Sequence, residues 1–275
     1  MLSNNIINKI IIDRYSLAGV ILLSCILILC FLSLIAPDPI EPNLQNKLLP
    51  PFSDNHILGT DQIGRDVFAR ICHGAIISLY VGTLSSLIAT LFGVMVGVVA
   101  GYCGGRTDTL LMRIADIFLA FPQLILIIGV AAIFKPNIMV SILIIGFTSW
   151  PSVARLIRSH TLVLTSYDFI IQAQSMKYSN FYIIRKHILP NCISPIIIVF
   201  TLGISSGIMA EASLSFIGLG VQAPNPSWGV MINEAKIYFV SATHLAILPG
   251  VAITTTVLSI NIIGEKLRDV LDIKA

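Results

Sequence analysis

The chain has 275 residues, of which 56% are hydrophobic and only 11% are charged, and its mean hydropathy is +0.90. Soluble domains carry about 25% charged residues, so this composition excludes an ordinary soluble domain and indicates an integral membrane protein. The net charge of +3 is small, and the basic residues are spread between apolar runs. This distribution favours a role in membrane orientation over nucleic-acid binding. The five cysteines have no C-x-x-C spacing, so we expect no metal or redox site from them.

Six apolar runs predict an all-α protein with six transmembrane helices. Residues 1–14 form a short polar start, and the uncharged run 15–36 is long enough to cross a bilayer core of about 30 Å. This run is longer than the apolar region of a signal peptide, so we interpret it as a retained anchor. The other five runs lie in the segment 75–264, which a charged tail at 265–275 follows. They extend roughly over 75–102, 113–134, 138–154, 193–212 and 245–264.

The segment 37–74 is expected to form an extended, proline-rich loop. Thr60 or Asp61 could cap a short amphipathic helix near the end of this loop. Its apolar face would hold Ile63, Val67, Phe68 and Ile71, and its charged face would leave Arg65, Asp66 and Arg70 in water. The pattern leaves open whether this helix only lies at the membrane interface or has a functional role.

Glycine and proline positions suggest how two spans pack. Gly93, Gly97 and Gly101 recur at intervals of four, which places them on one face where a neighbouring helix can approach closely. We interpret this face as a packing surface. Pro122 is expected to kink the third span.

The distribution of Lys and Arg predicts the orientation. Six spans place both termini on one side, and a cytoplasmic N-terminus puts twelve basic residues inside and five outside, as the positive-inside rule requires. We therefore expect cytoplasmic termini, a cytoplasmic segment 168–191, and extracytoplasmic loops at 37–74 and 211–244. The inside set is Lys9, Arg14, Arg106, Arg113, Arg155, Arg158, Lys177, Arg185, Lys186, Lys266, Arg268 and Lys274, and the outside set is Lys47, Arg65, Arg70, Lys135 and Lys236.

The segment 168–191 reads as two short amphipathic helices between apolar spans. Thr165 to Asp168 matches a capping box, and Asp168 complements the positive end of a helix dipole. A second helix is expected from about Ser179, with a stop near Pro190. The pattern alone allows either a helix pair on the lipid surface or a pair that docks into a cytosolic partner. The apolar faces would hold Phe169, Ile170, Ala173 and Met176 in the first helix and Phe181, Ile184 and Ile188 in the second.

Four blocks carry a resemblance to a known family. The segment 168–191 resembles the cytoplasmic coupling loop of bacterial ABC importer permeases, approximately E-Y-V-E-A-A-x-x-x-G followed by I-L-P-N. Asp168-Phe169-Ile170 matches its start, Ala173 its second alanine, and HILPN at 187–191 its end. The chain from about Tyr15 to Asp272 is similar to dipeptide, oligopeptide and nickel importer permeases, in particular the second of their two permease subunits. The blocks that show this are LGTDQIGRDVFAR (58–70), GYCGGRTDTLLMRIADIFLAFP (101–122) and ASLSFIGLGVQAPNPSWGVMI (212–232).

The resemblance implies a permease subunit in the bacterial cytoplasmic membrane that is not itself an enzyme. Its partners would be membrane lipid, a second homologous permease, two cytosolic ATPases and an extracytoplasmic substrate-binding protein, with no nucleic acid. The chain has no G-x-x-x-x-G-K-[ST] loop, so we expect ATP to be bound by the partners and no cofactor by this chain. A coupling loop at 157–192 would contact an ATPase through Asp168, Phe169, Ile171, Gln172, Ala173, Met176 and Lys177.

Three of these residues depart from the family pattern. Ile171 and Gln172 replace the acidic residue and first alanine of the central triplet, and Lys177 replaces the loop glycine. A residue with a Cβ in a left-handed turn costs about 1–2 kcal/mol, so either the turn differs or the strain is accepted. We hypothesise that Ile171 and Met176 fill an apolar groove of the ATPase while Asp168 makes the polar contact.

The loop after the fifth span is expected to cover the outer mouth of the pathway as irregular backbone. Two roles stay open for it, a structural gate cover and direct contact with substrate or with the binding protein. The candidate residues are Gly218, Gly220, Pro224, Pro226 and Trp228, together with Asp61 and Arg65.

An ion-coupled secondary transporter is the alternative from another class. Such proteins carry an ionisable group inside a span, whereas we expect Asp116 and Glu211 near span ends and Lys135 in a turn. The five histidines are dispersed without an H-E-x-x-H motif, which argues against a zinc enzyme. The cargo is expected to be a peptide, with nickel or a metal chelate as the alternative.

Overall fold

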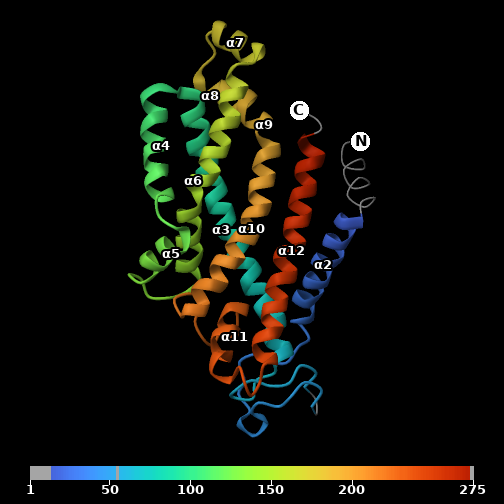
Figure 1. Cartoon of the computed structure of the whole chain (residues 1–275). Coiled ribbons are helices and arrows are strands. Elements are labelled where there is room, and N and C mark those ends of the chain that lie inside the picture. Colours follow the sequence, from blue (N-terminus) through green and yellow to red (C-terminus); the bar gives the residue numbers. More distant parts are fainter. Residues whose placement is uncertain (1–13, 54–55, 273–275) are drawn as a thin grey trace.

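The computed structural model describes residues 14–53 and 56–272 and shows an elongated bundle of helices (Figure 1). Within these residues five helices are long and apolar enough to cross a membrane: α2 (Arg14–Leu32), α3 (Val67–Cys103), α6 (Ile138–Thr165), α10 (Ile193–Ile217) and α12 (His244–Asp272). A sixth candidate is the pair α4 (Gly105–Leu119) and α5 (Gln123–Ala131), which is bent by 83°. The all-α prediction is confirmed, and six spans result when the bent pair counts as one.

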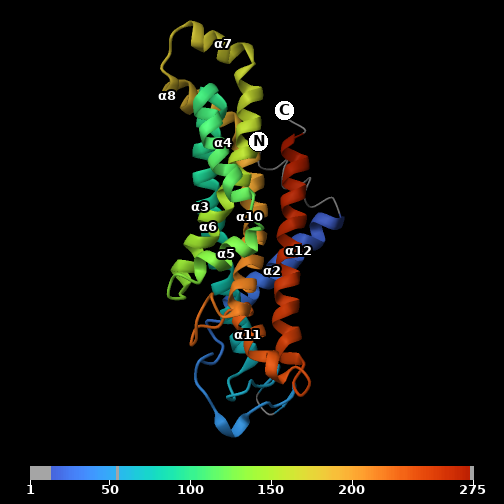
Figure 2. The same cartoon turned by 60° about the vertical axis from the view of Figure 1, so that its left-hand side comes forward.

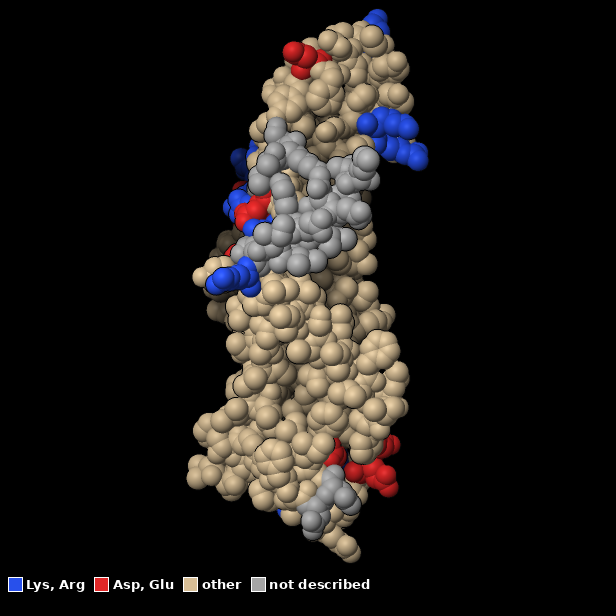
Figure 3. Space-filling model, turned by 90° about the vertical axis from the view of Figure 1, so that its right-hand side faces the viewer, with Lys and Arg blue, Asp and Glu red and all other residues tan. Residues whose placement is uncertain are grey.

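The bundle has two dissimilar ends (Figures 1 and 2). At the hairpin end lie α7 (Asp168–Ser175) and α8 (Asn180–Ile183), on the same side as the start of α2 and the end of α12. At the opposite loop end lie residues 37–66, which include the short helix η1 (Leu44–Asn46), and α11 (Trp228–Ala235), which η3 (Lys236–Tyr238) follows. Between the two ends, the face in Figure 3 shows a belt without Lys, Arg, Asp or Glu. The residues predicted for the termini, 1–13 and 273–275, lie outside the described part, and the cytoplasmic side stays a prediction.

The helix expected near the end of the 37–74 loop is absent as a separate element, and that prediction is wrong. The long helix α3 begins at Val67, where the Asp66 side chain accepts a hydrogen bond from the Ala69 amide at 2.8 Å. Asp66 therefore provides the cap in place of Thr60 or Asp61. The expectation that Arg65, Asp66 and Arg70 lie in water is also wrong, because their exposed fractions are only 5%, 9% and 2%.

The face of α3 with the three spaced glycines lies against α6. A Cβ on Gly97 would lie 2.5 Å from the Ala154 carbonyl oxygen, and a Cβ on Gly101 would lie 2.9 Å from the Arg158 carbonyl oxygen. A Cβ on Gly93 would meet Val153 at 2.6 Å. The two backbones therefore approach as closely as the absence of side chains permits, which adds dispersion energy that lipid does not supply.

The third span breaks at Pro122. Proline supplies no amide hydrogen for the helix ladder and disfavours helical backbone at the residue before it, so α4 ends at Leu119 and α5 begins at Gln123.

Asp116 lies in the last turn of α4, eleven residues after its first residue Gly105. The expectation that Asp116 lies near a span end is wrong when the bent pair α4 and α5 counts as one span, because α4 begins earlier than the apolar run. Its carboxylate forms an exposed ion pair of 2.6 Å with Arg155.

Candidate functional site

At the loop end, four charged side chains from two distant segments form an ionic cluster, in which Asp61, Arg65 and Arg70 are buried and the Glu234 side chain is 21% exposed. Asp61 accepts hydrogen bonds from Arg65 Nε at 2.6 Å and from Arg70 Nη1 at 2.5 Å. Glu234 on α11 accepts from Arg65 Nη2 and Arg70 Nη1, both at 2.7 Å. Two cations and two anions balance each other, which buried charges require. The cluster, here called the outer ionic cluster, joins the start of α3 to α11.

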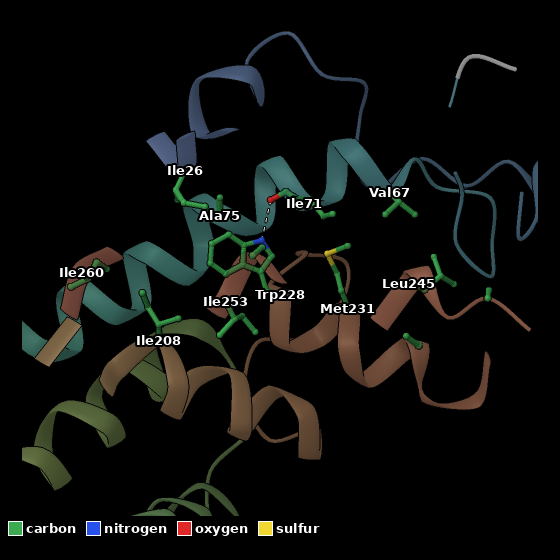
Figure 4. Packing of buried hydrophobic residues seen from close by; sticks show 13 residues of the cluster. Ile26, Val67, Ile71, Ala75, Ile208, Trp228, Met231, Leu245, Ile253 and Ile260 are labelled. Atoms are coloured by element: carbon green, nitrogen blue, oxygen red, sulfur yellow. Dashed lines mark hydrogen bonds between the residues drawn. The ribbon is translucent and has the colours of Figure 1, made fainter. Parts of the chain in front are cut away.

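Trp228 of α11 packs against α3 and adds a second contact between these two helices. Its side chain is fully buried, and its Nε1 donates a hydrogen bond to the Ile71 carbonyl at 3.1 Å (Figure 4). Gly74 leaves room for the indole, because a Cβ there would lie 3.1 Å from the ring atom Cδ1. Trp228 therefore has a structural position in the core, with Ile208 and Ile253 beside it.

Glu211 connects three elements inside the protein. Its carboxylate accepts hydrogen bonds from Ser215 at 2.7 Å, from Ser227 at 2.8 Å and from Ser78 at 3.3 Å. Ser227 is also the residue that caps α11, since its side chain accepts from the Val230 amide. The carboxylate is fully buried two turns before the end of α10, so it is a structural junction more than a residue of the span end.

The remaining outer-loop candidates lie in mixed environments. Gly218 ends α10 in the left-handed conformation with φ of 89°, and Gly220 is buried against Ser215. Pro226 is buried, whereas Pro224 is exposed. Trp228, Asp61 and Arg65 are thus buried packing residues, and their role at an outer gate stays a prediction.

At the hairpin end, α7 and α8 form the predicted helix-turn-helix, but local details differ. The capping box is wrong: Thr165 Oγ1 donates back to the Leu162 carbonyl, and α7 begins after Tyr167, which makes no side-chain cap. Asp168 does lie in the first turn of α7, where it complements the helix dipole. Ser179 caps α8 as expected, accepting from the Tyr182 amide at 3.2 Å.

Lys177 adopts a left-handed conformation with φ of 57°, so the strain is accepted where the family pattern has glycine. The surrounding hydrogen bonds explain why. The Tyr178 amide donates to the Ala173 carbonyl, and the Lys177 amide donates to the Gln174 carbonyl. This pair of bonds is a Schellman motif, which needs a left-handed residue at this position.

The predicted apolar face of α7 is split between two environments, which corrects the sequence-based face. Ile170 and Ala173 point inward and are buried against Ile183 and Ile188, while Phe169 and Met176 are exposed by 39% and 69%. The other predicted coupling residues, Asp168, Ile171, Gln172 and Lys177, are exposed. Ala173 therefore belongs to the hairpin core.

Pro190 does not stop the second helix. A π-helical turn η2 (Ile184–Ile188) and α9 (Leu189–Asn191) continue the chain toward α10. His187 in this turn lies 6.1 Å from the Phe169 ring and 5.9 Å from the Tyr182 ring, between centroids, which links α7 to α8. This aromatic contact was not predicted from the sequence, because only the fold brings positions 169, 182 and 187 together.

Comparison with known proteins identifies the family. The profile of the binding-protein-dependent transport system inner membrane component matches residues 93–274. The chain is 40% identical over 264 residues to a dipeptide transport system permease protein of Alkalihalophilus pseudofirmus, covering 95% of this chain and 86% of that protein. It is 44% identical over 222 residues to a glutathione transport system permease protein of Pectobacterium atrosepticum, covering 81% and 74%.

A solved structure supports the fold. An inward-facing methionine ABC transporter superposes with a TM-score of 0.61 at 18% identity, over 72% of this chain and 94% of that chain. The chain therefore belongs to the binding-protein-dependent inner membrane components of ABC transporters, multi-pass proteins of the cytoplasmic membrane that act with separate ATPase and substrate-binding proteins and are not themselves enzymes.

Proposed function

We propose that this chain is one of the two permease subunits of an ATP-driven importer of short peptides. The observation that carries the proposal is the identity of 40% and 44% with dipeptide and glutathione permeases over most of the chain. The second permease would be a different, homologous chain that completes a heterodimer. No observation favours the nickel or metal-chelate alternative, and a family that depends on a binding protein argues against the ion-coupled transporter.

The hairpin is the proposed contact with a cytosolic ATPase, which would bind the ATP. Phe169 and Ile171 of α7 and Met176, which directly follows it, are exposed apolar residues. The helix α7 extends beyond the membrane-spanning helices (Figure 2). Large exposed apolar side chains of this kind mark protein interaction sites. An ATPase contact at this hairpin would put the hairpin end in the cytoplasm, in agreement with the count of basic residues.

The packing of the hairpin supports a mechanical role. Ile170 and Ala173 of α7 lie in one buried cluster with Ile157 of α6 and with Ile183 and Ile188. Because this cluster fixes the hairpin to the end of α6, closure of an ATPase dimer would move the hairpin and the spans as a rigid body. Outward and inward openings of the pathway would then alternate with ATP binding and hydrolysis in the partner.

Reconstitution tests the cargo. The permease pair, its ATPases and its binding protein would be placed in proteoliposomes, and uptake of radiolabelled alanyl-alanine and of Ni²⁺ would be measured. We expect alanyl-alanine uptake that requires ATP. Uptake of Ni²⁺ alone, or peptide uptake that continues on a proton gradient after ATP is removed, would contradict the proposal.

Substitutions in α7 test the docking surface. We expect Ile171→Glu to weaken co-purification of the ATPase, because it places a charge in an apolar contact, and Asp168→Ala to lower transport. Gln174→Ala is the matched control, since Gln174 is also exposed on α7 but lies outside the proposed contact. If both test variants behave like the control, the assignment of these residues is wrong.

A further inference from the structure

A cavity of about 240 Å³ lies between α3, α5, α6 and α10, near the middle of the spans. Its floor is formed by Ser85, Ser86 and Thr90 of α3, which are buried. Gln123 and Ser206 lie on its open side and are exposed. Apolar helices thus surround a concentration of uncharged hydrogen-bonding groups. The hydroxyls of Ser85, Ser86 and Ser206 donate to backbone carbonyls, which satisfies them in a span and leaves their oxygen lone pairs free to accept.

The cavity continues as a groove between α6 and α10, where a second cavity of about 210 Å³ shares Leu156, Val199 and Leu202 with it. A third cavity, of about 410 Å³, lies between α4 and α6 and shares only Ser152 and Leu156 with the first. On α6 the lining residues recur at helical spacing, so they share one face, and the same holds for α10. These residues are Ser149, Ser152, Leu156 and His160 on α6, and Pro195, Val199, Leu202 and Ser206 on α10. We call these two faces the α6–α10 groove.

The chemistry of the cavity suits a peptide backbone. Gln123 Nε2 donates to Ser149 Oγ at 2.9 Å, and Ser149 Oγ donates to the Ile145 carbonyl at 2.6 Å. Ser152 Oγ donates to the Ser149 carbonyl at 3.0 Å. These hydroxyl oxygens keep lone pairs that accept from an amide N–H, and the hydroxyls can rotate to donate to a carbonyl. Neutral donors and acceptors match every peptide bond equally, whatever the side chain of the cargo.

The same lining is unsuited to a bare divalent cation. Transition metals are bound in proteins by imidazole, thiolate and carboxylate groups. None of the residues that line the 240 Å³ cavity is His, Cys, Asp or Glu. The lining therefore argues against bare Ni²⁺ as the cargo held in this cavity.

We propose that this cavity binds the backbone of the peptide during its passage through the membrane, and that the α6–α10 groove is this chain's half of the pathway. The peptide as cargo rests on the proposed function, whereas the groove rests only on the positions of the lining residues. Its open side would face the second permease, which would supply the other wall.

Cysteine labelling in the assembled transporter tests the groove without reference to cargo. Ser206→Cys and Thr201→Cys, each in a chain whose five native cysteines are replaced by alanine, would be treated with a charged, membrane-impermeant thiol reagent. Both positions are on α10, but Thr201 lines neither the 240 Å³ cavity nor the 210 Å³ cavity. We expect Ser206→Cys to react at least about tenfold faster. Equal labelling rates at the two positions would contradict the assignment of the α6–α10 groove to the pathway, whatever cargo the transporter carries. Ser152→Cys on α6 provides a second position should Ser206→Cys fail to assemble.

Transport assays test the recognition of the backbone. We expect Gln123→Leu and Thr90→Val to lower alanyl-alanine uptake about threefold to tenfold, the effect of one lost neutral hydrogen bond. Thr254→Val is the control, since Thr254 is an exposed threonine of α12 outside the cavity. Uptake equal to the control would overturn backbone recognition. A wild-type transporter that fails to import alanyl-alanine while Ser206→Cys still reacts fast would overturn the proposed cargo and leave the groove intact.

Discussion

Arg70 on α3 and Glu234 on α11 are in direct contact, with 2.7 Å between Nη1 and Oε2, although 164 residues separate them in the chain. Asp61 shares the same arginine nitrogen at 2.5 Å. The sequence block 58–70 and the loop after the fifth span therefore form one structural unit at the loop end. Arg65 completes the charge balance of this unit.

Removing Arg70 tests the outer ionic cluster. Its side chain and that of Asp61 are only 3% and 4% exposed. Arg70→Met leaves a buried carboxylate with one cation fewer, so we expect the free energy of unfolding to fall by about 3–5 kcal/mol. Denaturant titration of the purified chain in detergent micelles measures this change. Arg106→Met, at an exposed arginine of α4, is the control and should alter stability by less than about 0.5 kcal/mol.

The charged residues at the loop end lie in a different environment from the predicted one, and the difference has one physical cause. Local patterns place Arg65, Asp66 and Arg70 in water because isolated charges are stable only there. The burial of the two arginines depends on Glu234, a partner that no local window contains. The helix cap could not be predicted either. Several acidic or hydroxyl residues have the chemistry of a cap, and only the path of the chain selects Asp66.

Features that depend on residues close together in the sequence were predicted better than contacts between distant residues. The Pro122 break and the start of α8 at Ser179 follow from single residues whose backbone effects are local. The cavity lining, in contrast, was not predicted, because Ser85, Gln123 and Ser206 lie far apart in sequence and each alone resembles an ordinary helix residue. A row of serines at 149, 152 and 159 on one face of a span was the available signal.

Gly97→Ala tests the contact between α3 and α6. A Cβ there would lie 2.5 Å from a backbone oxygen of α6, so the helices must separate, and we expect a loss of about 1–3 kcal/mol. Gly129→Ala in α5 is a matched control, because a Cβ there meets nothing within 4 Å. This control should gain up to about 1 kcal/mol from helix propensity. Unfolding titrations of the two variants would show opposite shifts, and two losses of equal size would contradict the packing argument.

Trp228→Phe tests the anchor of α11. The substitution removes the hydrogen bond to Ile71 and leaves a cavity in a fully buried cluster. We expect a loss of about 2–4 kcal/mol in the free energy of unfolding. Tyr80→Phe serves for comparison, because Tyr80 is 51% exposed and its loss of a polar group should have little effect. A destabilisation of Trp228→Phe no larger than that of Tyr80→Phe would show that the indole contact is unimportant.

Lys177→Gly tests the strain in the hairpin turn. Glycine adopts the left-handed conformation without a Cβ penalty, so we expect the hairpin to gain about 1 kcal/mol of local stability. Lys177→Ala separates strain from charge, since alanine removes the ammonium group and keeps the Cβ. Hydrogen exchange measured by mass spectrometry should show slower exchange over residues 168–183 in Lys177→Gly alone. If Lys177→Ala slows exchange equally, the charge of Lys177, and not its backbone conformation, destabilises the turn.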